Sequence, residues 1–178
     1  NRGWAYWLKG NLAKALADYD EALRIEPGNV DALNDRAAIF DDQGDFNRAI
    51  AEYEKLLAAH PDDGRALNGR AWGYAQKGEL DKALADSERA VALLKDEPNA
   101  IHTRAWIYMN KGQLDLALAD FDRALSLDPE LAGAYADRGR AYELKGDRDK
   151  AVADYRKSLS LKSRQVYDDK AKAAALQH

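Results

Sequence analysis

The sequence predicts an all-α fold built from a repeated helix-turn-helix unit. The main observation is a strict period of 34 residues, marked by Gly10, Gly44, Gly78, Gly112 and Gly146. An aromatic residue lies four positions before each glycine, and an alanine lies five positions after it. Self-similarity at such a period is the signature of a repeat architecture. No alternation of apolar and polar residues and no hairpin dipeptide in the sequence favours strands.

The second copy of the repeat shows how each unit is expected to fold. Apolar residues from Leu33 to Phe40 have the spacing of one helix face, which predicts a first helix over residues 32–43. Gly44 follows where a helix needs a left-handed residue to close. A second helix then runs to about residue 59, because Pro61 prevents its continuation.

The period also sets the expected boundaries along the 178 residues. The ends of a repeat array must hide an apolar face, and Tyr167, Ala171 and Ala174 form a stripe suited to a C-terminal capping helix. Asn1 falls about five residues into a copy, so we expect the chain to be a fragment of a longer protein. The expected parts are a shortened first copy (1–29), four whole copies (30–63, 64–97, 98–131 and 132–165) and the capping helix (166–178).

The skeleton Phe40–x8–Ala49–x3–Tyr53–x7–Pro61, repeated at period 34, resembles the tetratricopeptide repeat (TPR) family. This resemblance covers residues 1–165 and implies an α-solenoid, a right-handed superhelix of stacked helix pairs. It also implies a concave surface, lined mainly by first helices, that holds extended peptides or partner helices. The place of the family's leading tryptophan departs from the pattern and holds Leu33, Leu67, Ile101 and Tyr135.

A column of arginines occupies the place where the family usually has a leucine in the first helix. A charge between helices is costly unless it is paired, and an acid follows each arginine after 16 residues. We expect a structural ladder of ion pairs, within or between copies; in the alternative, the arginines merely extend to solvent. The expected partners are Arg2 with Asp18, Arg36 with Glu52, Arg70 with Asp86, Arg104 with Asp120, and Arg138 with Asp154.

The candidate binding surface is a stripe at i, i+4 and i+7 on the first helices, and all four tryptophans of the chain fall on it. Tryptophan is enriched at binding hot spots because it buries a large rigid surface. In the alternative, the tryptophans pack between adjacent first helices and expose only their edges. The candidate groove residues are Trp4, Trp7, Asn34, Asp41, Asn68, Trp72, His102, Trp106, Met109 and Arg140.

The residues of this stripe predict an apolar, proline-rich or helical peptide as ligand. The amides of Asn34 and Asn68 offer a donor and an acceptor each to its main chain. Asp41, Asp42 and Asp45 favour a basic residue in the part of the ligand near the second copy.

The net charge of −4 argues against nucleic acid as a partner, but it conceals an asymmetry along the chain. Residues 30–63 carry a net −6, and residues 132–165 carry a net +4. Such an asymmetry suits weak head-to-tail homo-oligomers, although evenly solvated charges that keep a solenoid soluble are an equally simple explanation.

Catalytic, metal and cofactor chemistry has no support in the sequence. The chain has no cysteine, and His60, His102 and His178 are isolated from one another. No apolar run is long enough for membrane insertion, and the compartment stays open. The sequence therefore predicts a non-catalytic protein-interaction scaffold. The alternatives are a self-associating structural module and the recognition arm of a larger, enzymatic protein.

Overall fold

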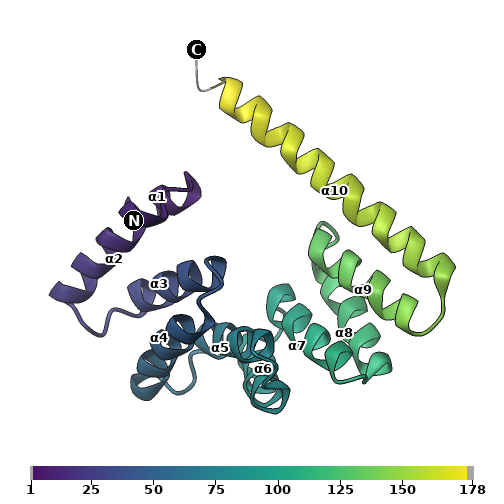
Figure 1. Ribbon diagram of the computed structural model, residues 1–178, viewed down its shortest axis with the longest axis horizontal. Coiled ribbons are helices and arrows are strands. Elements are labelled where there is room, and N and C mark those ends of the chain that lie inside the picture. The colour runs from purple at the N-terminus through teal and green to yellow at the C-terminus, as the bar shows by residue number, and fades with distance from the viewer. Residues whose placement is uncertain (1, 176–178) are drawn as a thin grey trace. The chain divides into compact units, whose positions relative to one another are not determined.

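The computed structural model describes the backbone of residues 2–175 and the side chains as far as Lys162. These residues form ten helices and no strand, so the predicted all-α fold is confirmed (Figure 1). None of the described helices combines the length and apolar character needed to cross a membrane. The helices are α1 (Arg2–Leu8), α2 (Leu12–Ile25), α3 (Val30–Asp42), α4 (Phe46–Ala59), α5 (Gly64–Gln76), α6 (Leu80–Leu94), α7 (Pro98–Asn110), α8 (Leu114–Leu127), α9 (Ala132–Leu144) and α10 (Arg148–Ala175).

The turn inside each helix pair depends on the periodic glycine. The five glycines have φ between 72° and 82°, a conformation that a side chain makes costly. In the second copy, Gly44 donates its N–H to the carbonyl of Asp41, and the Asp45 carboxylate accepts the N–H of Arg48. The glycine thus ends α3, and the aspartate caps α4 one residue later.

The chain divides into two compact units, Asn1–Lys95 and Asp96–His178. In the first unit each odd-numbered helix packs on the helix that follows it, and α2 and α4 also pack on the next pair. The second unit repeats this arrangement with α7 to α10. Successive first helices also meet inside each unit, α3 with α5 and α7 with α9.

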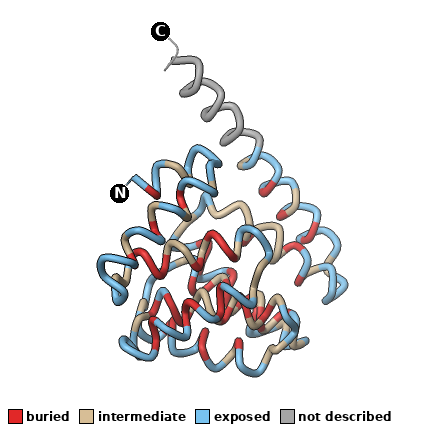
Figure 2. Tube along the Cα trace, turned by 60° about the vertical axis from the view of Figure 1, so that its left-hand side comes forward, coloured by how far each residue is buried: buried red, intermediate tan, exposed pale blue. Residues whose placement is uncertain are grey.

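Both units bury a core of small and aromatic side chains between their helices. Figure 2 shows buried residues in short recurring stretches along the helices, separated by exposed positions. Leu33, Leu67 and Ile101 are buried where the family usually places its tryptophan. In the first unit, Tyr19 and Tyr53 fill the space between the helices at 1% and 5% exposure.

The C-terminal segment differs in form from the predicted separate capping helix. Helix α10 runs without interruption over 28 residues, so residues 166–175 continue the second helix of the fifth copy. The side chains of Tyr167, Ala171 and Ala174, which form the predicted capping stripe, lie outside the described residues, as do residues 176–178.

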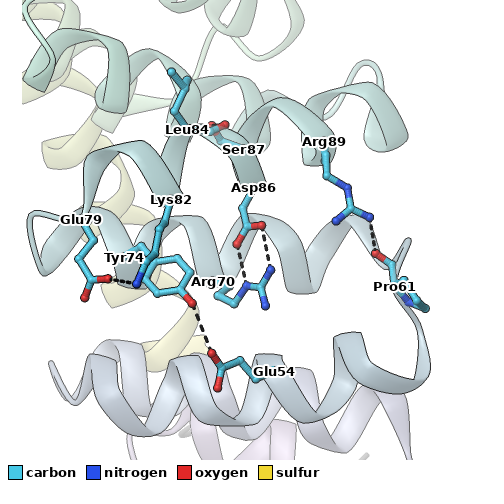
Figure 3. A network of polar contacts seen from close by, with 10 residues as sticks. All are labelled: Glu54, Pro61, Arg70, Tyr74, Glu79, Lys82, Leu84, Asp86, Ser87 and Arg89. Carbon is cyan, nitrogen blue, oxygen red and sulfur yellow. Dashed lines mark hydrogen bonds and ion pairs between the residues drawn. The ribbon is translucent and has the colours of Figure 1, made fainter.

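An ion pair joins the two helices of every copy at the positions that the 16-residue spacing predicts. Four of the five arginines bind their aspartate through two hydrogen bonds each, as Figure 3 shows for Arg70 and Asp86. The shortest N···O distances are 2.6 Å for Arg2–Asp18, 2.6 Å for Arg36–Glu52, 2.7 Å for Arg70–Asp86, 2.7 Å for Arg104–Asp120 and 2.7 Å for Arg138–Asp154.

Two arginines of this ladder also reach the preceding copy. Arg36 donates to Asp20 at 2.6 Å, and Arg138 donates to Asp122 at 2.7 Å, so one guanidinium joins three helices in each case. Asp20 and Asp122 are exposed, and each lies 16 residues before the arginine that it binds, so the ladder uses the same spacing in the opposite direction.

The inner rungs of the ladder are shielded from water, whereas the first is not. The Arg70 and Asp86 side chains are 20% and 10% exposed, but the Arg2 side chain is 77% exposed. Burial alone raises the pKa of Glu52, yet hydrogen bonds from Arg36 and Lys55 hold it below its ordinary value. The hydrogen bonds to Asp86 likewise raise the pKa of Arg70.

We predict that Arg70→Met lowers the unfolding free energy by about 3 kcal/mol, because it leaves the carboxylate of Asp86 buried and unpaired. Arg2→Met is the matched control in the same column and the same unit. Its pair is exposed to solvent, so we expect a much smaller loss of stability. Urea unfolding followed by circular dichroism measures both, and equal losses in the two variants would contradict a shielded ladder.

Candidate functional site

The candidate stripe of the first unit lies where α3 and α5 meet. Asn34 and Asp41 face the stripe from α3, and Asn68, Trp72 and Ala75 belong to α5. Asn34 is only 8% exposed and Ala75 is 4% exposed, whereas Asp41, Asn68 and Trp72 are half-buried. The stripe is therefore a largely dry surface that carries several polar groups.

Unsatisfied polar atoms gather on this stripe. Five side-chain nitrogen or oxygen atoms of the described residues are inaccessible to water and have no hydrogen-bond partner in the protein. Three of them are stripe atoms: Asn34 Nδ2, Asp41 Oδ1 and Asn68 Oδ1. Because buried polar atoms are nearly always hydrogen-bonded, three such atoms on one surface require an explanation.

Asp41 is the most perturbed group of the stripe. The pKa of Asp41 is raised to about 7, chiefly by burial and also by the charge of Asp42, although a hydrogen bond from Tyr53 acts in the opposite direction. That hydrogen bond joins Tyr53 Oη to Asp41 Oδ2 at 3.0 Å. Burial, followed by the charge of Asp41, raises the pKa of the Tyr53 phenol.

A glycine on α5 makes room for this tyrosine. A Cβ at Gly69 would lie 2.2 Å from Cζ and 2.4 Å from Oη of Tyr53, so no other residue fits without moving the ring. Tyr53 of α4 thus passes under α5 and presents its hydroxyl to Asp41 of α3. The aromatic at 53 and the glycine 16 residues later together are the sequence signal for this contact, which the sequence analysis did not identify.

The tryptophans are neither fully exposed in a groove nor fully buried between adjacent first helices. Trp4 is 50% exposed, and Trp7, Trp72 and Trp106 are half-buried. Trp7 is fixed to the next first helix, because its indole Nε1 donates to Asp42 Oδ2 at 2.8 Å. None of the four is fully buried, so each retains some surface that a ligand can contact.

The second unit corrects one expectation. Met109 was predicted to line the surface, but it is 3% exposed and packs in the core of α7, α8 and α9. Residues of the neighbouring helices thus bury a side chain that its own helix pattern places on the outside. His102, also predicted to line the surface, is half-buried, and its Nε2 lies 2.8 Å from Oδ2 of Asp137 on α9. Arg140 is exposed.

The predicted sites therefore remain as two separate patches, each described within its own unit. In the first unit Asn34 and Asp41 of α3 and Asn68 and Trp72 of α5 belong to two helices that contact each other, and Trp7 is bonded to Asp42. The second unit contributes half-buried Trp106 and the His102–Asp137 pair. No three metal-ligating side chains converge within the described part of the chain.

Three sequence profiles of one family match the chain. A tetratricopeptide repeat profile matches residues 6–73, a TPR repeat profile matches residues 105–146, and a second tetratricopeptide repeat profile matches residues 132–165. No curated protein sequence matches the chain.

Solved structures give the same result. TTC0263, a thermophilic TPR protein of Thermus thermophilus, has a TM-score of 0.80 at 23% identity, over 99% of this chain and 96% of that chain. A MamA structure has a TM-score of 0.70 at 26% identity, over 94% and 98%. YrrB, described as a TPR protein with an unusual peptide-binding site, has a TM-score of 0.65 at 24% identity, over 96% and 88%. Together with the 34-residue period and the sequential helix pairs, these matches show that the chain belongs to the tetratricopeptide repeat family.

Proposed function

We propose that this chain is a non-catalytic scaffold that binds an extended peptide segment of a partner protein along the α3–α5 stripe. TPR proteins generally bind proteins or peptides and are usually non-catalytic. YrrB offers a precedent for peptide binding within the fold. The specific support comes from the unsatisfied atoms of the stripe in this chain.

The main support is a complementary pair of amide groups on neighbouring first helices. Asn34 Nδ2 is an unused donor on α3, and Asn68 Oδ1 is an unused acceptor on α5. A peptide main chain offers a carbonyl to the first and an N–H to the second, once the two amide side chains, whose atoms are inaccessible in the free chain, turn toward it. Each bond would relieve a buried group whose lack of a partner costs about 1–3 kcal/mol.

These groups favour an extended peptide over a partner helix. A helix satisfies its main-chain N–H and C=O groups internally, except at its ends. An extended strand of peptide leaves them free to meet Asn34 and Asn68. The partly exposed ring of Trp72, on the same face of α5 as Asn68, supplies apolar contact beside them.

Self-association through opposite charges has weaker support. Four of the nine acids of the second copy form ion pairs: Asp31 with Arg65, Asp45 with Arg48, Glu52 with Arg36 and Lys55, and Asp62 with Arg89. Its net −6 therefore overstates the charge offered to another molecule. Light scattering after size exclusion at low and high salt tests this alternative, which requires a mass that falls as salt rises.

The binding surface itself is tested by selecting 12-residue peptides from a random phage library on the immobilised chain. Synthetic versions of the enriched peptides are then titrated into the chain and followed by fluorescence anisotropy. A selection that enriches nothing over the bare support overturns the proposal.

We predict that Asn34→Leu weakens binding of a selected peptide by about tenfold while the unfolding free energy stays equal or rises. The substitution removes a buried amide donor that has no partner in the protein and keeps its shape, which is neutral or stabilising for folding. Anisotropy and urea unfolding measure the two effects.

The control is Asn47→Leu, which changes an exposed asparagine on α4 and should leave affinity unchanged. A structural role for Asn34 predicts the opposite pattern, in which stability falls and affinity falls only with it. If the selected peptide binds the Asn34 variant as tightly as the unmodified chain, Asn34 does not bond the peptide main chain.

A further inference from the structure

Three acids of α3 remain without a cationic partner in a chain where most acids are paired. Among the described residues, no lysine or arginine forms an ion pair with Asp35, Asp41 or Asp42. Of the three, Asp41 contacts the Tyr53 hydroxyl directly, at 3.0 Å between its Oδ2 and Tyr53 Oη. Burial, then Asp41, and then the charges of Asp42 and Asp35 raise the pKa of the Tyr53 phenol.

One carboxylate oxygen of Asp41 accepts no hydrogen bond from the described residues. Asp41 uses Oδ2 to accept the Tyr53 hydroxyl, but Oδ1 is inaccessible and has no partner. Asp42 uses Oδ2 to accept the indole N–H of Trp7 at 2.8 Å and is otherwise exposed. The two carboxylates are thus held by neutral donors, the Tyr53 hydroxyl and the Trp7 indole N–H, which fix their positions and leave their negative charge uncompensated.

A second observation ties this cluster to the ligand. Asn34, more than nine-tenths buried and with an unpartnered Nδ2, precedes Asp41 by two helical turns on the same face of α3. Seven residues of helix span roughly 10 Å, which is about three residues of extended chain. A peptide bonded to Asn34 therefore brings a side chain about three residues away to Asp41.

We propose that Asp41 and Asp42, together with the indole of Trp7, form a subsite for an arginine side chain of the bound peptide. This inference rests on the proposed function and adds the chemistry of one ligand residue to it. Arginine suits the site better than lysine, because its planar guanidinium is weakly hydrated, binds carboxylates through several donors and stacks on aromatic rings. It would supply the missing donor to Asp41 Oδ1, which is inaccessible in the free chain, once the Asp41 side chain turns toward the ligand.

Binding at this subsite should depend on pH near neutrality. The titratable groups acting on Asp41 are Asp42 of its own helix and Tyr53 of α4, whereas Asn68 and Trp72 of the α5 stripe are uncharged. The pKa of Asp41 is about 7 in the free protein, so its carboxyl is protonated and neutral at pH 5 and charged at pH 8.5. We therefore expect arginine to bind at pH 8.5 and to bind weakly at pH 5.

The same group should make folding stability depend on pH. Because folding raises the pKa of Asp41 above its ordinary value, the folded state holds the proton more tightly than the unfolded chain. Its contribution to stability is fully present below the ordinary pKa and is lost as pH rises through about 7. Asp41→Asn does not titrate, so it should raise the thermal midpoint at pH 8.5 and have little effect at pH 5. A variant that is less stable than the unmodified chain at pH 8.5 would contradict an uncompensated charge at this position.

The subsite is tested with Nα-acetyl-arginine amide added to the ¹⁵N-labelled chain, with the indole N–H signal of Trp7 as the readout. We expect a saturable shift at pH 8.5 and about tenfold weaker binding at pH 5. Nα-acetyl-citrulline amide, the neutral isostere, should produce no shift, and the lysine analogue should bind more weakly than arginine.

Two variants and one control assign the effect to the acids. Asp41→Asn and Asp42→Asn should each weaken the arginine probe about tenfold at pH 8.5. Asp31→Asn changes an acid of the same helix that is already paired with Arg65 and should have no effect. The proposal is overturned if arginine gives no saturable shift, if citrulline matches it, or if Asp31→Asn weakens binding as much as Asp41→Asn.

The outcome is separable from that of the proposed function. If selected peptides bind the stripe equally well after every arginine is replaced by citrulline, that result supports peptide binding and contradicts the arginine subsite. If the arginine probe binds but no peptide is enriched, the subsite is supported and the proposed peptide-binding function is contradicted.

Discussion

The fold depends on a charge that each helix pair must neutralise. In each copy after the first, an arginine projects from the first helix into the contact with the second helix, where an uncompensated charge would oppose packing. The acid 16 residues later meets it because the pair turns at a glycine and runs antiparallel, which places the two columns at similar heights. At Arg36 and Arg138 the same guanidinium also reaches the preceding copy, so the interaction that closes a helix pair joins it to its neighbour. Stability in such an array is a sum of pair and neighbour contributions.

The tryptophans of this chain do not occupy the buried place that the family usually gives them. Leucine or isoleucine fills the buried place that the family gives to tryptophan, and the four tryptophans instead retain exposed surface. The polar groups that the ladder does not use collect on α3 and α5, where Asn34, Asp41 and Asn68 each keep one buried atom without a partner. Ion pairing is nearly complete on the ladder and incomplete on the stripe. This contrast separates the part of the chain that maintains the fold from the part that we propose meets a ligand.

The sequence was sufficient for features that follow from period and spacing. The 34-residue repeat located the glycine turns, and the constant 16-residue interval located all five ion pairs. It was insufficient where a neighbouring copy decides the environment. A helical stripe shows which face Met109 occupies but not that the α8 and α9 side chains cover it. The Tyr53–Asp41 and Trp7–Asp42 bonds depend on side chains crossing between helices, for which the pattern of one helix carries no signal.

The central claim is that the unsatisfied groups of α3 and α5 are completed by the main chain of a bound peptide. A crystal structure of the chain with a selected peptide tests it most directly. We expect an extended peptide on the stripe, with one of its carbonyl oxygens about 2.9 Å from Asn34 Nδ2 and one of its N–H groups at the same distance from Asn68 Oδ1. A peptide bound elsewhere, or one that contacts the stripe only through its side chains while both amide atoms stay unpaired, would contradict it.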